Sequence, residues 1–351
     1  MKTLIEKLER THTLTRAEYE ALLEGRSDET AALLAEKASR IRQRVFGNGI
    51  YTRGLIEISS FCRCDCLYCG IRRSNGGAAR YRLTEDEILG CCRTGYALGF
   101  RTFVLQGGED DYFTDDRLEP LIAQIKAEHP DCAVTLSLGE RSRESYRRLR
   151  AAGADRYLLR HETADKTQYA LLHPPAQTFE NRMRCLLDLR DLGYQTGCGF
   201  LVGAPGQTTA SMAENLKFVE EFHPAMCGIG PFLPHGATPF ADCPPGTLEE
   251  TCYLLSILRL QSPGMLLPAT TALGTAHPRG RELGILAGAN VVMPNLSPQA
   301  VRKKYELYEG KICTGEEAAE CRGCLERRMA AIGCTLAVDR GDTKIDGEDT
   351  I

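Results

Sequence analysis

Three cysteines within eight residues are the clearest chemical feature of the sequence. Cys62, Cys66 and Cys69 form a C-x3-C-x2-C pattern directly after the strand-like run Gly54 to Ser59. Thiolates are the usual ligands of iron-sulfur clusters. Three thiols this close in sequence can hold one cluster only from a loop, because a helix or strand would direct them to different faces. Three ligands for four irons leave one iron open, where the amino and carboxylate groups of a small molecule can bind.

A zinc site is the alternative for these thiols, with Cys64 or a distant residue as the fourth ligand, because C-x2-C is also half of a zinc motif. Zinc knuckles usually present two separated pairs of ligands. Here all three thiols lie in one loop, and no C-x2-C or H-x3-H partner follows for a long way. The single loop favours the iron-sulfur interpretation, with Cys64 as a bystander.

Composition narrows the class of protein. The 351 residues exceed the usual single domain but suit one (β/α)8 barrel, and the net charge of -4 with mixed signs argues against a nucleic-acid partner. Residues 1–20 contain no apolar signal segment and no window reaches membrane-spanning length, so we expect a cytoplasmic protein without membrane contact. In that compartment the sixteen cysteines cannot be a disulfide framework. Metal ligation and small buried thiols account for them better.

The first 50 residues have the pattern of a helical cap outside the main domain. Thr15 and Glu18 form a capping-box pair, and Glu29 to Arg44 is rich in Ala, Leu, Glu and Arg at helical spacing. We therefore expect a separate helical cap over 1–50.

From Gly54 onward, short apolar runs alternate with amphipathic helical segments. The expected strands are Leu55 to Ser59, Thr102 to Leu105, Ala133 to Leu138, Arg156 to Leu159, Gln195 to Val202, Met226 to Gly230, Leu266 to Thr271 and Asn290 to Met293. The expected helices are Thr84 to Leu98, Asp116 to Glu128, Arg143 to Ala152, Phe179 to Leu192, Ser211 to Phe222, Leu248 to Leu260 and Gly280 to Ala287. This order favours an α/β fold with a closed parallel (β/α)8 TIM barrel over 51–297, with its chemistry on the loops after the strands. A carboxyl-terminal extension over 298–351 follows.

Polar residues finish the second and third expected strands. Gln106, Gly107 and Gly108 end the second strand, where the glycines either let backbone approach a ligand closely or mark a plain turn. Thr135 and Ser137 point to the same side of the third. Inward hydroxyls suit a polar ligand, although small side chains that fill a barrel layer are an alternative.

Charged residues end the fourth strand. Arg160, His161 and Glu162 stand together there, and such side chains are rarely buried without partners or a ligand. A solvated run of loop charges is the alternative. Arg182 lies early in the following helix, where a guanidinium can clamp a carboxylate bidentately.

The later strand ends are less specific. Thr270 and Thr271 end the seventh strand and Met293 the eighth; together with Tyr305 and Tyr308 they can complete the far side of a pocket. Core packing is an equal alternative for Met293. The Pro- and Gly-rich run Pro231 to Gly246 is expected to form a long loop over the barrel mouth.

A second cysteine group follows the last strand. Cys313, Cys321 and Cys324 are spaced C-x7-C-x2-C, with Cys334 as a further candidate, which suits an auxiliary [2Fe-2S] or [4Fe-4S] cluster. Zinc, or reduced thiols without metal, are the alternatives. The charged end from Asp339 is expected to be loose.

The first cysteine group resembles the signature of radical S-adenosylmethionine (SAM) enzymes, with Tyr68 as the aromatic residue before the last cysteine. The stretches 54–57, 69–73, 154–163, 228–232 and 289–295 resemble the radical SAM maturases of [FeFe]-hydrogenase of the HydE type, and the match spans roughly residues 50–325. Gly107 stands where some relatives carry serine.

The resemblance implies a role for each matched residue. It implies that Cys62, Cys66 and Cys69 hold a [4Fe-4S] cluster. It places Tyr68, Gln106, Gly107, Gly108, Ser137, Ile229, Glu162 and Arg182 around SAM, and Thr135, Arg156, Arg160, Thr270, Thr271, Met293, Tyr305 and Tyr308 around the substrate cavity.

The implied activity is reductive cleavage of SAM to a 5′-deoxyadenosyl radical. That radical acts on a small substrate, a cysteine-bound iron carbonyl cyanide complex, with other hydrogenase maturases and a low-potential electron donor as partners. The alternatives are hydrogen abstraction from an organic substrate, as in biotin synthase or methylornithine synthase, and a non-catalytic iron-sulfur scaffold or carrier.

Overall fold

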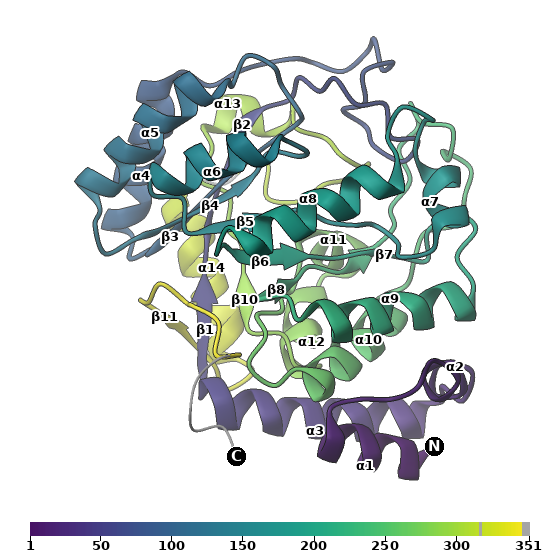
Figure 1. Cartoon of the computed structure of the whole chain (residues 1–351). Coiled ribbons are helices and arrows are strands. Elements are labelled where there is room, and N and C mark those ends of the chain that lie inside the picture. Colours follow the sequence, from purple (N-terminus) through teal and green to yellow (C-terminus); the bar gives the residue numbers. More distant parts are fainter. Residues whose placement is uncertain (316–317, 346–351) are drawn as a thin grey trace.

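Six parallel strands form the main sheet of the protein, whose computed structural model describes residues 1–315 and 318–345 (Figure 1). They run in the order β2 (Gly54–Ser59), β3 (Thr102–Gly107), β4 (Ala133–Ser137), β5 (Arg156–Leu158), β6 (Gln195–Cys198) and β8 (Met226–Cys227). Every residue of β2 is buried, as expected for a strand that is covered on both faces.

Short parallel pairings close this sheet into a barrel. Met226 pairs with Leu266, Pro268 with Val291, and Leu55 with Asn295. At the last junction the Leu55 N–H donates to the Pro294 carbonyl at 2.9 Å and the Leu296 N–H donates to the Leu55 carbonyl at 2.7 Å. Residues 266–268 and β10 (Val291–Val292) are thus the seventh and eighth strands, and the predicted (β/α)8 barrel is confirmed.

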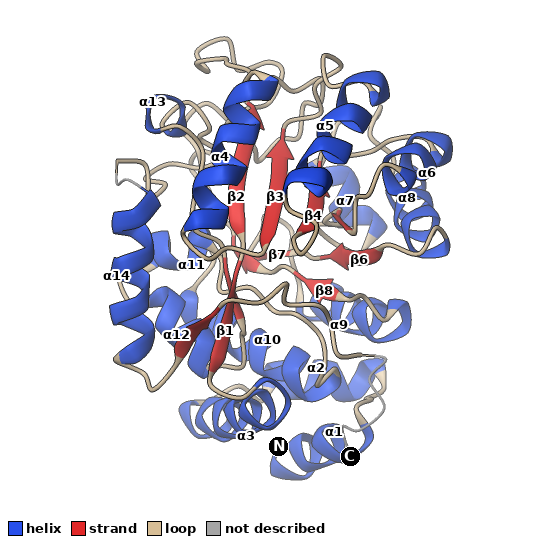
Figure 2. Cartoon of the chain, turned by 90° about the vertical axis from the view of Figure 1, so that its left-hand side faces the viewer, coloured by secondary structure: helices blue, strands red, loops and turns tan. Residues whose placement is uncertain are grey.

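The predicted helices surround the barrel, each within two residues of its expected bounds. They are α4 (Glu85–Ala97), α5 (Asp115–Glu128), α6 (Arg143–Ala151), α8 (Phe179–Asp191), α9 (Thr209–Phe222), α10 (Leu248–Gln261) and α12 (Gly280–Leu286). Figure 2 shows α4 and α5 in front of strands β2, β3 and β4. The capping box of Thr84 and Glu87 fixes the start of α4.

Two predicted strands are shorter than expected. Residues 195–202 divide into β6 and β7 (Leu201–Val202), and β7 pairs with β9 (Gly230–Pro231). The break falls at Gly199, where a Cβ atom would meet the Gly228 carbonyl oxygen at 2.0 Å. The prediction of a strand up to Thr271 was wrong, because the Thr270 side chain accepts a hydrogen bond from the Leu273 N–H and starts helix α11 (Thr271–Ala276).

Three further helices lie outside the predicted pattern: α7 (Lys166–Leu172), α13 (Gln299–Arg302) and α14 (Ala318–Ala330). None of the described helices has the length and apolar character needed to cross a membrane.

The amino-terminal segment forms three helices below the barrel in Figure 1: α1 (Lys2–Thr11), α2 (Arg16–Glu24) and α3 (Asp28–Phe46). Helix α2 packs against α9, and α3 packs against α10. The Tyr253 hydroxyl donates to the Leu22 carbonyl at 2.7 Å, and the predicted capping box of Thr15 and Glu18 is present.

The carboxyl-terminal segment closes the amino end of the barrel. Strand β1 (Gly49–Thr52) lies between β10 and β11 (Thr335–Ala337), parallel to both. Beyond β11, Asp342 lies 2.5 Å from the Arg156 guanidinium, and Arg340 pairs with Asp155. The prediction of a loose end from Asp339 was therefore wrong as far as residue 345; residues 346–351 lie outside the described part of the chain.

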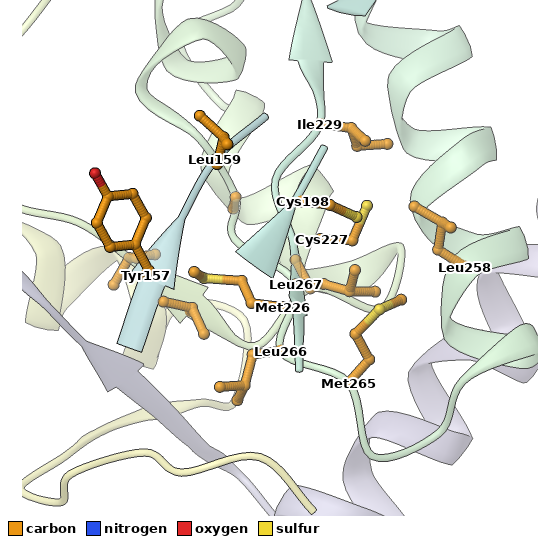
Figure 3. Packing of buried hydrophobic residues seen from close by; sticks show 14 of the residues in the cluster. Tyr157, Leu159, Cys198, Met226, Cys227, Ile229, Leu258, Met265, Leu266 and Leu267 are labelled. Carbon is orange, nitrogen blue, oxygen red and sulfur yellow. The ribbon is translucent and has the colours of Figure 1, made fainter. Parts of the chain in front are cut away.

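Apolar and sulfur side chains fill the space between the later strands and the helices. Figure 3 shows Cys198 of β6 beside Cys227 of β8, with Met226, Leu266 and Leu267 nearby. These side chains belong to one buried cluster, which confirms that part of the cysteine content serves as small core residues.

Candidate active site

One cavity of about 350 Å³ opens at the carboxyl ends of the barrel strands and contains most of the predicted site residues. From the cysteine loop and the first strands it is lined by Cys62, Cys64, Cys66, Tyr68, Cys69, Gln106, Gly107, Gly108 and Ser137. From the remaining strands and the extension it is lined by Arg160, Glu162, Arg182, Thr270, Thr271, Met293, Tyr305 and Tyr308. The loop after β9 adds Phe232 and Leu233, as predicted for a segment over the mouth.

The cysteine loop is held by its own carboxylate. Asp65 Oδ1 accepts from Arg72 Nε at 2.8 Å and from the Ser74 N–H at 3.0 Å, and its Oδ2 accepts from Ser74 Oγ at 2.7 Å. These bonds, the Arg72 contact first, lower the pKa of Asp65, so the carboxylate stays ionised and can accept them over a wide pH range. The Gly70 N–H donates to the Leu307 carbonyl at 2.8 Å, which ties the loop to the extension.

Burial and hydrogen bonding shift the pKa values of the thiols in this loop. It raises the pKa of Cys66 to about 11 and also raises the pKa of Cys69, whereas a hydrogen bond from Cys64 lowers the pKa of Cys62 to about 7. In the part of the chain that the structure describes, no three Cys, His, Asp or Glu side chains converge on one point. The fit to a cluster therefore rests on the donors: three soft thiols on one loop and in one cavity, the ligand type of iron-sulfur clusters.

The end of β3 lies directly against this loop. A Cβ atom on Gly108 would meet the Phe61 carbonyl oxygen at 2.2 Å, so no larger residue fits without displacing backbone. Gln106 Nε2 lies 3.4 Å from the Tyr305 hydroxyl, across the cavity. The glycines predicted to allow close approach of backbone thus bring β3 against the cysteine loop.

Charged groups gather at the end of β5. Arg160 Nη2 lies 3.1 Å from Glu162 Oε2, yet both atoms are buried without a partner in hydrogen-bond geometry. Glu162 has a φ of 65°, a conformation that a non-glycine residue adopts only when its surroundings hold it there. Arg182 is fixed by Glu140 Oε1 at 2.6 Å and by a bond to the Arg160 carbonyl. The unaligned Arg160 and Glu162 atoms can therefore bind a polar ligand.

Comparison with known proteins identifies the family. The radical SAM superfamily model matches residues 56–219. The "[FeFe] hydrogenase maturase subunit HydE" of Thermotoga maritima is 42% identical over 343 residues, which cover 98% of this chain and 97% of the relative. The chain belongs to the HydE family of radical SAM enzymes.

More distant relatives share the fold of this HydE family member. The 3-methylornithine synthase of Methanosarcina barkeri is 30% identical over 300 residues, 85% of this chain and 84% of the relative. Among solved structures, a methylornithine synthase (PylB) superposes with a TM-score of 0.83 at 27% identity, covering 95% of this chain and 97% of that one. The maturase HydG superposes with a TM-score of 0.79 at 19% identity, over 95% of this chain and 74% of that one, and supports the fold alone.

Three residues that the HydE resemblance placed in the site lie elsewhere. Arg156 begins β5 at the opposite end of the barrel, where it bonds Thr102 Oγ1 at 3.0 Å and Asp342; the prediction that it lines the cavity was wrong. Thr135 lies one layer below the cavity and is fully buried. The Ile229 side chain is buried in the core, while its neighbours Gly228 and Gly230 line the cavity.

The cavity of this HydE family member also contains an ion pair that the sequence analysis missed. Lys311 Nζ lies 2.5 Å from Glu57 Oε1, and the two side chains are 7% and 1% exposed. Asn295 Nδ2 donates to Glu57 Oε2 at 2.9 Å, and Lys311 also donates to the Tyr305 carbonyl at 2.8 Å. Burial raises the pKa of Glu57 and Lys311 opposes that effect. The single charged residue within the apolar strand β2 was the signal that could have revealed the pair.

Gln177 is a second site residue that the sequence did not reveal. It lies in the connection between α7 and α8 and lines the cavity beside Cys66. Nothing in its local sequence distinguishes it from an ordinary loop glutamine.

The second cysteine group lies in the extension. Cys321 is buried and Cys324 is exposed on α14, while Cys313 has a φ of 62° in the preceding loop and accepts a contact from Arg281 Nη2 at 3.3 Å. Its use as a ligand set for a second cluster stays a prediction.

Proposed function

We propose that the protein is a radical SAM maturase that acts in assembly of the diiron subcluster of [FeFe]-hydrogenase. One observation carries the proposal: the thiols of Cys62, Cys66 and Cys69 share one barrel cavity with Arg160 and Glu162, in a chain that matches a HydE subunit over 98% of its length. In this proposal the three thiols hold a [4Fe-4S] cluster, and SAM binds beside it.

When bound, the cluster supplies the electron that cleaves the SAM sulfonium to methionine and a 5′-deoxyadenosyl radical. The residues of the chain would bind and orient SAM and shield the reacting atoms from water. The glycines that end β3 would let backbone approach the amino acid part of SAM, and Glu162 and Arg182 would supply charges to its polar groups. The surrounding barrel limits the access of water to the reacting atoms.

The substrate that we propose is a cysteine-bound iron carbonyl cyanide complex delivered by another maturase. The support is chemical: Arg160 offers unaligned donors toward the cavity, and Thr270 and Thr271 add hydroxyl groups to the wall. An anionic small complex fits such a surface. A low-potential electron donor and a cytoplasmic location belong to the same proposal.

We also propose the division of the chain into a helical cap over 1–50, the barrel over 51–297 and an extension over 298–351. In that extension Cys313, Cys321 and Cys324 are the proposed ligands of an auxiliary cluster, as either [2Fe-2S] or [4Fe-4S].

Hydrogen abstraction from an organic substrate is the second candidate, because a 3-methylornithine synthase is 30% identical over 85% of this chain. The two candidates differ in their substrate: an organic substrate would lose a hydrogen atom to the radical under the second candidate and be left unchanged under the first. A non-catalytic scaffold would bind a cluster but release no 5′-deoxyadenosine.

Cleavage of SAM by anaerobically reconstituted, reduced protein tests the proposal. We expect Cys66→Ala to abolish formation of 5′-deoxyadenosine and Cys321→Ala to retain most of it. Equal losses in the two variants, or no 5′-deoxyadenosine from the wild-type protein, would contradict the assignment.

A further inference from the structure

The connection between α7 and α8 supports the cysteine loop from one side. The Leu67 N–H donates to the Leu172 carbonyl at 2.9 Å, and the Tyr68 hydroxyl lies 3.4 Å from His173 Nε2. The His173 ring stacks on Tyr169 with centroids 4.0 Å apart. This packing holds the connection at a fixed distance from the thiols.

Gln177 reaches from that connection to a thiol of the loop. Its Nε2 lies 3.4 Å from Cys66 Sγ, and its Oε1 accepts a hydrogen bond from the Asp65 N–H at 3.2 Å. A backbone N–H can only donate, so Oε1 must face Asp65 and the NH2 group must face the sulfur. The Gln177 N–H itself donates to the Pro174 carbonyl at 2.9 Å, which fixes the start of the side chain.

The contact with Cys66 changes when the thiol loses its proton. The Cys66 thiol can donate weakly to Gln177 Oε1, 3.6 Å away, but a thiolate has no proton to donate. Only the N–H to sulfur bond then persists. The Gln177 NH2 group, 3.4 Å from the sulfur, is then the donor that faces the negative charge of Cys66.

The other two proposed cluster ligands have different partners. The sulfur of Cys62 faces the Cys64 thiol and the backbone N–H groups of Cys64 and Glu109. The sulfur of Cys69 faces the backbone N–H of Ile71. A side-chain amide is thus directed at Cys66 in particular.

We propose that Gln177 is a positioning residue that donates a hydrogen bond to the cluster sulfur of Cys66 and thereby raises the reduction potential of the cluster. This inference rests on the proposed function, because it requires the cluster at Cys62, Cys66 and Cys69. A reduced cluster carries one more negative charge than the oxidised one, so a donor to its sulfur stabilises the reduced state more. The effect brings the cluster closer to the reach of a low-potential one-electron donor.

Redox titration of the reconstituted protein, followed by electron paramagnetic resonance, tests the proposal with dithionite as the one-electron donor. Gln177→Leu keeps the size of the side chain and removes the donor. At the wild-type midpoint we expect its ratio of oxidised to reduced cluster to rise about tenfold, a shift of about 59 mV to lower potential. Gln177→Glu keeps the acceptor for Asp65, removes the donor and adds a charge, so its potential should fall at least as far. Gln124→Leu, the same change at an exposed position on α5, should leave the potential unchanged.

Each result decides the matter. A ratio within twofold of wild type in Gln177→Leu, with the iron content intact, overturns the inference. If Gln177→Leu takes up no cluster, Gln177→Glu decides alone, and a potential equal to or above the wild-type value refutes the proposal. Failure of both variants to take up iron would make Gln177 a structural residue and equally refute tuning. A wild-type protein without a cluster signal would instead refute the proposed function.

Discussion

Replacing Lys311 with methionine tests the energetics of the cavity wall. Methionine retains the unbranched shape of the lysine stem but leaves Glu57, 1% exposed, without its cation. The Glu57 carboxylate keeps one hydrogen bond, from Asn295, and the attraction of the Arg302 charge. A buried carboxylate with a single neutral hydrogen-bond partner is strongly unfavourable, so the folded variant should hold Glu57 in its protonated form.

The cost of protonating Glu57 sets the size of the expected loss of stability. Protonating a carboxyl with an ordinary pKa of about 4.3 at pH 7 costs about 3.7 kcal/mol, at about 1.4 kcal/mol per pH unit. Removing one partner of a buried pair costs about 3–5 kcal/mol in general. Because burial already raises the pKa of Glu57 in the wild-type protein, these figures are upper bounds, and we expect Lys311→Met to lower the free energy of unfolding by up to about 3–4 kcal/mol at pH 7.

The pH dependence gives the expected sign. In the variant the folded state keeps a proton on Glu57 that the unfolded state releases above about pH 4.3. The loss of stability should therefore grow as the pH rises above about 4.3 and should disappear as the pH falls toward that value.

Urea unfolding of anaerobically prepared proteins with matched iron content measures these changes. Lys166→Met is the matched control, because Lys166 and its partner Glu180 are both 67% exposed, and we expect no resolvable change. The double variant Glu57→Gln and Lys311→Met removes both charges and keeps an acceptor for Asn295, so it should recover most of the lost stability. A single variant as stable as wild type at pH 7, or a double variant less stable than the single one, would refute this reasoning.

Three further predictions concern stability away from the thiols. Burial lowers the pKa of His161 to about 3, so the unfolded state takes up a proton below pH 6.5 that the folded state does not bind. His161→Asn should therefore reduce the loss of stability on acidification by up to about 1.4 kcal/mol per pH unit. The same substitution at the exposed His223 should not change that loss. Thr84→Ala removes the capping box of α4 and should lower the free energy of unfolding by about 1 kcal/mol in urea denaturation; an unchanged value would show that the cap contributes nothing. Asp342→Ala leaves the buried guanidinium of Arg156 without its carboxylate and should cost about 1–2 kcal/mol, with wild-type stability as the contrary result.

The barrel could be predicted because its signals are local. Capping boxes such as that of Thr84 and the alternation of apolar strands with amphipathic helices depend on neighbours within a few residues. The prediction for the second half of the seventh strand was wrong for a reason that is also local. Thr270 and Thr271 suit a strand by propensity, but the Thr270 hydroxyl caps a helix.

Site residues that directly follow a strand could be predicted from the sequence. Site residues that meet only because distant segments fold together could not. Arg160, Glu162 and Thr270 line the cavity because they follow the carboxyl ends of their strands, whereas Arg156 begins a strand and faces the other end of the barrel. Lys311 meets Glu57 across 254 positions of sequence, and Gln177 meets Cys66 across 111. The spacing of residues within a motif cannot predict contacts between segments so far apart in the sequence.

The position of β1 between β10 and β11 has a consequence for biosynthesis. A strand made among the first residues of the chain obtains its two neighbours only when residues 291–292 and 335–337 have been synthesised. On the ribosome its edges stay open to chaperones or to other nascent chains for most of translation. Closure of the amino end of the barrel by these three strands is therefore a late event in synthesis.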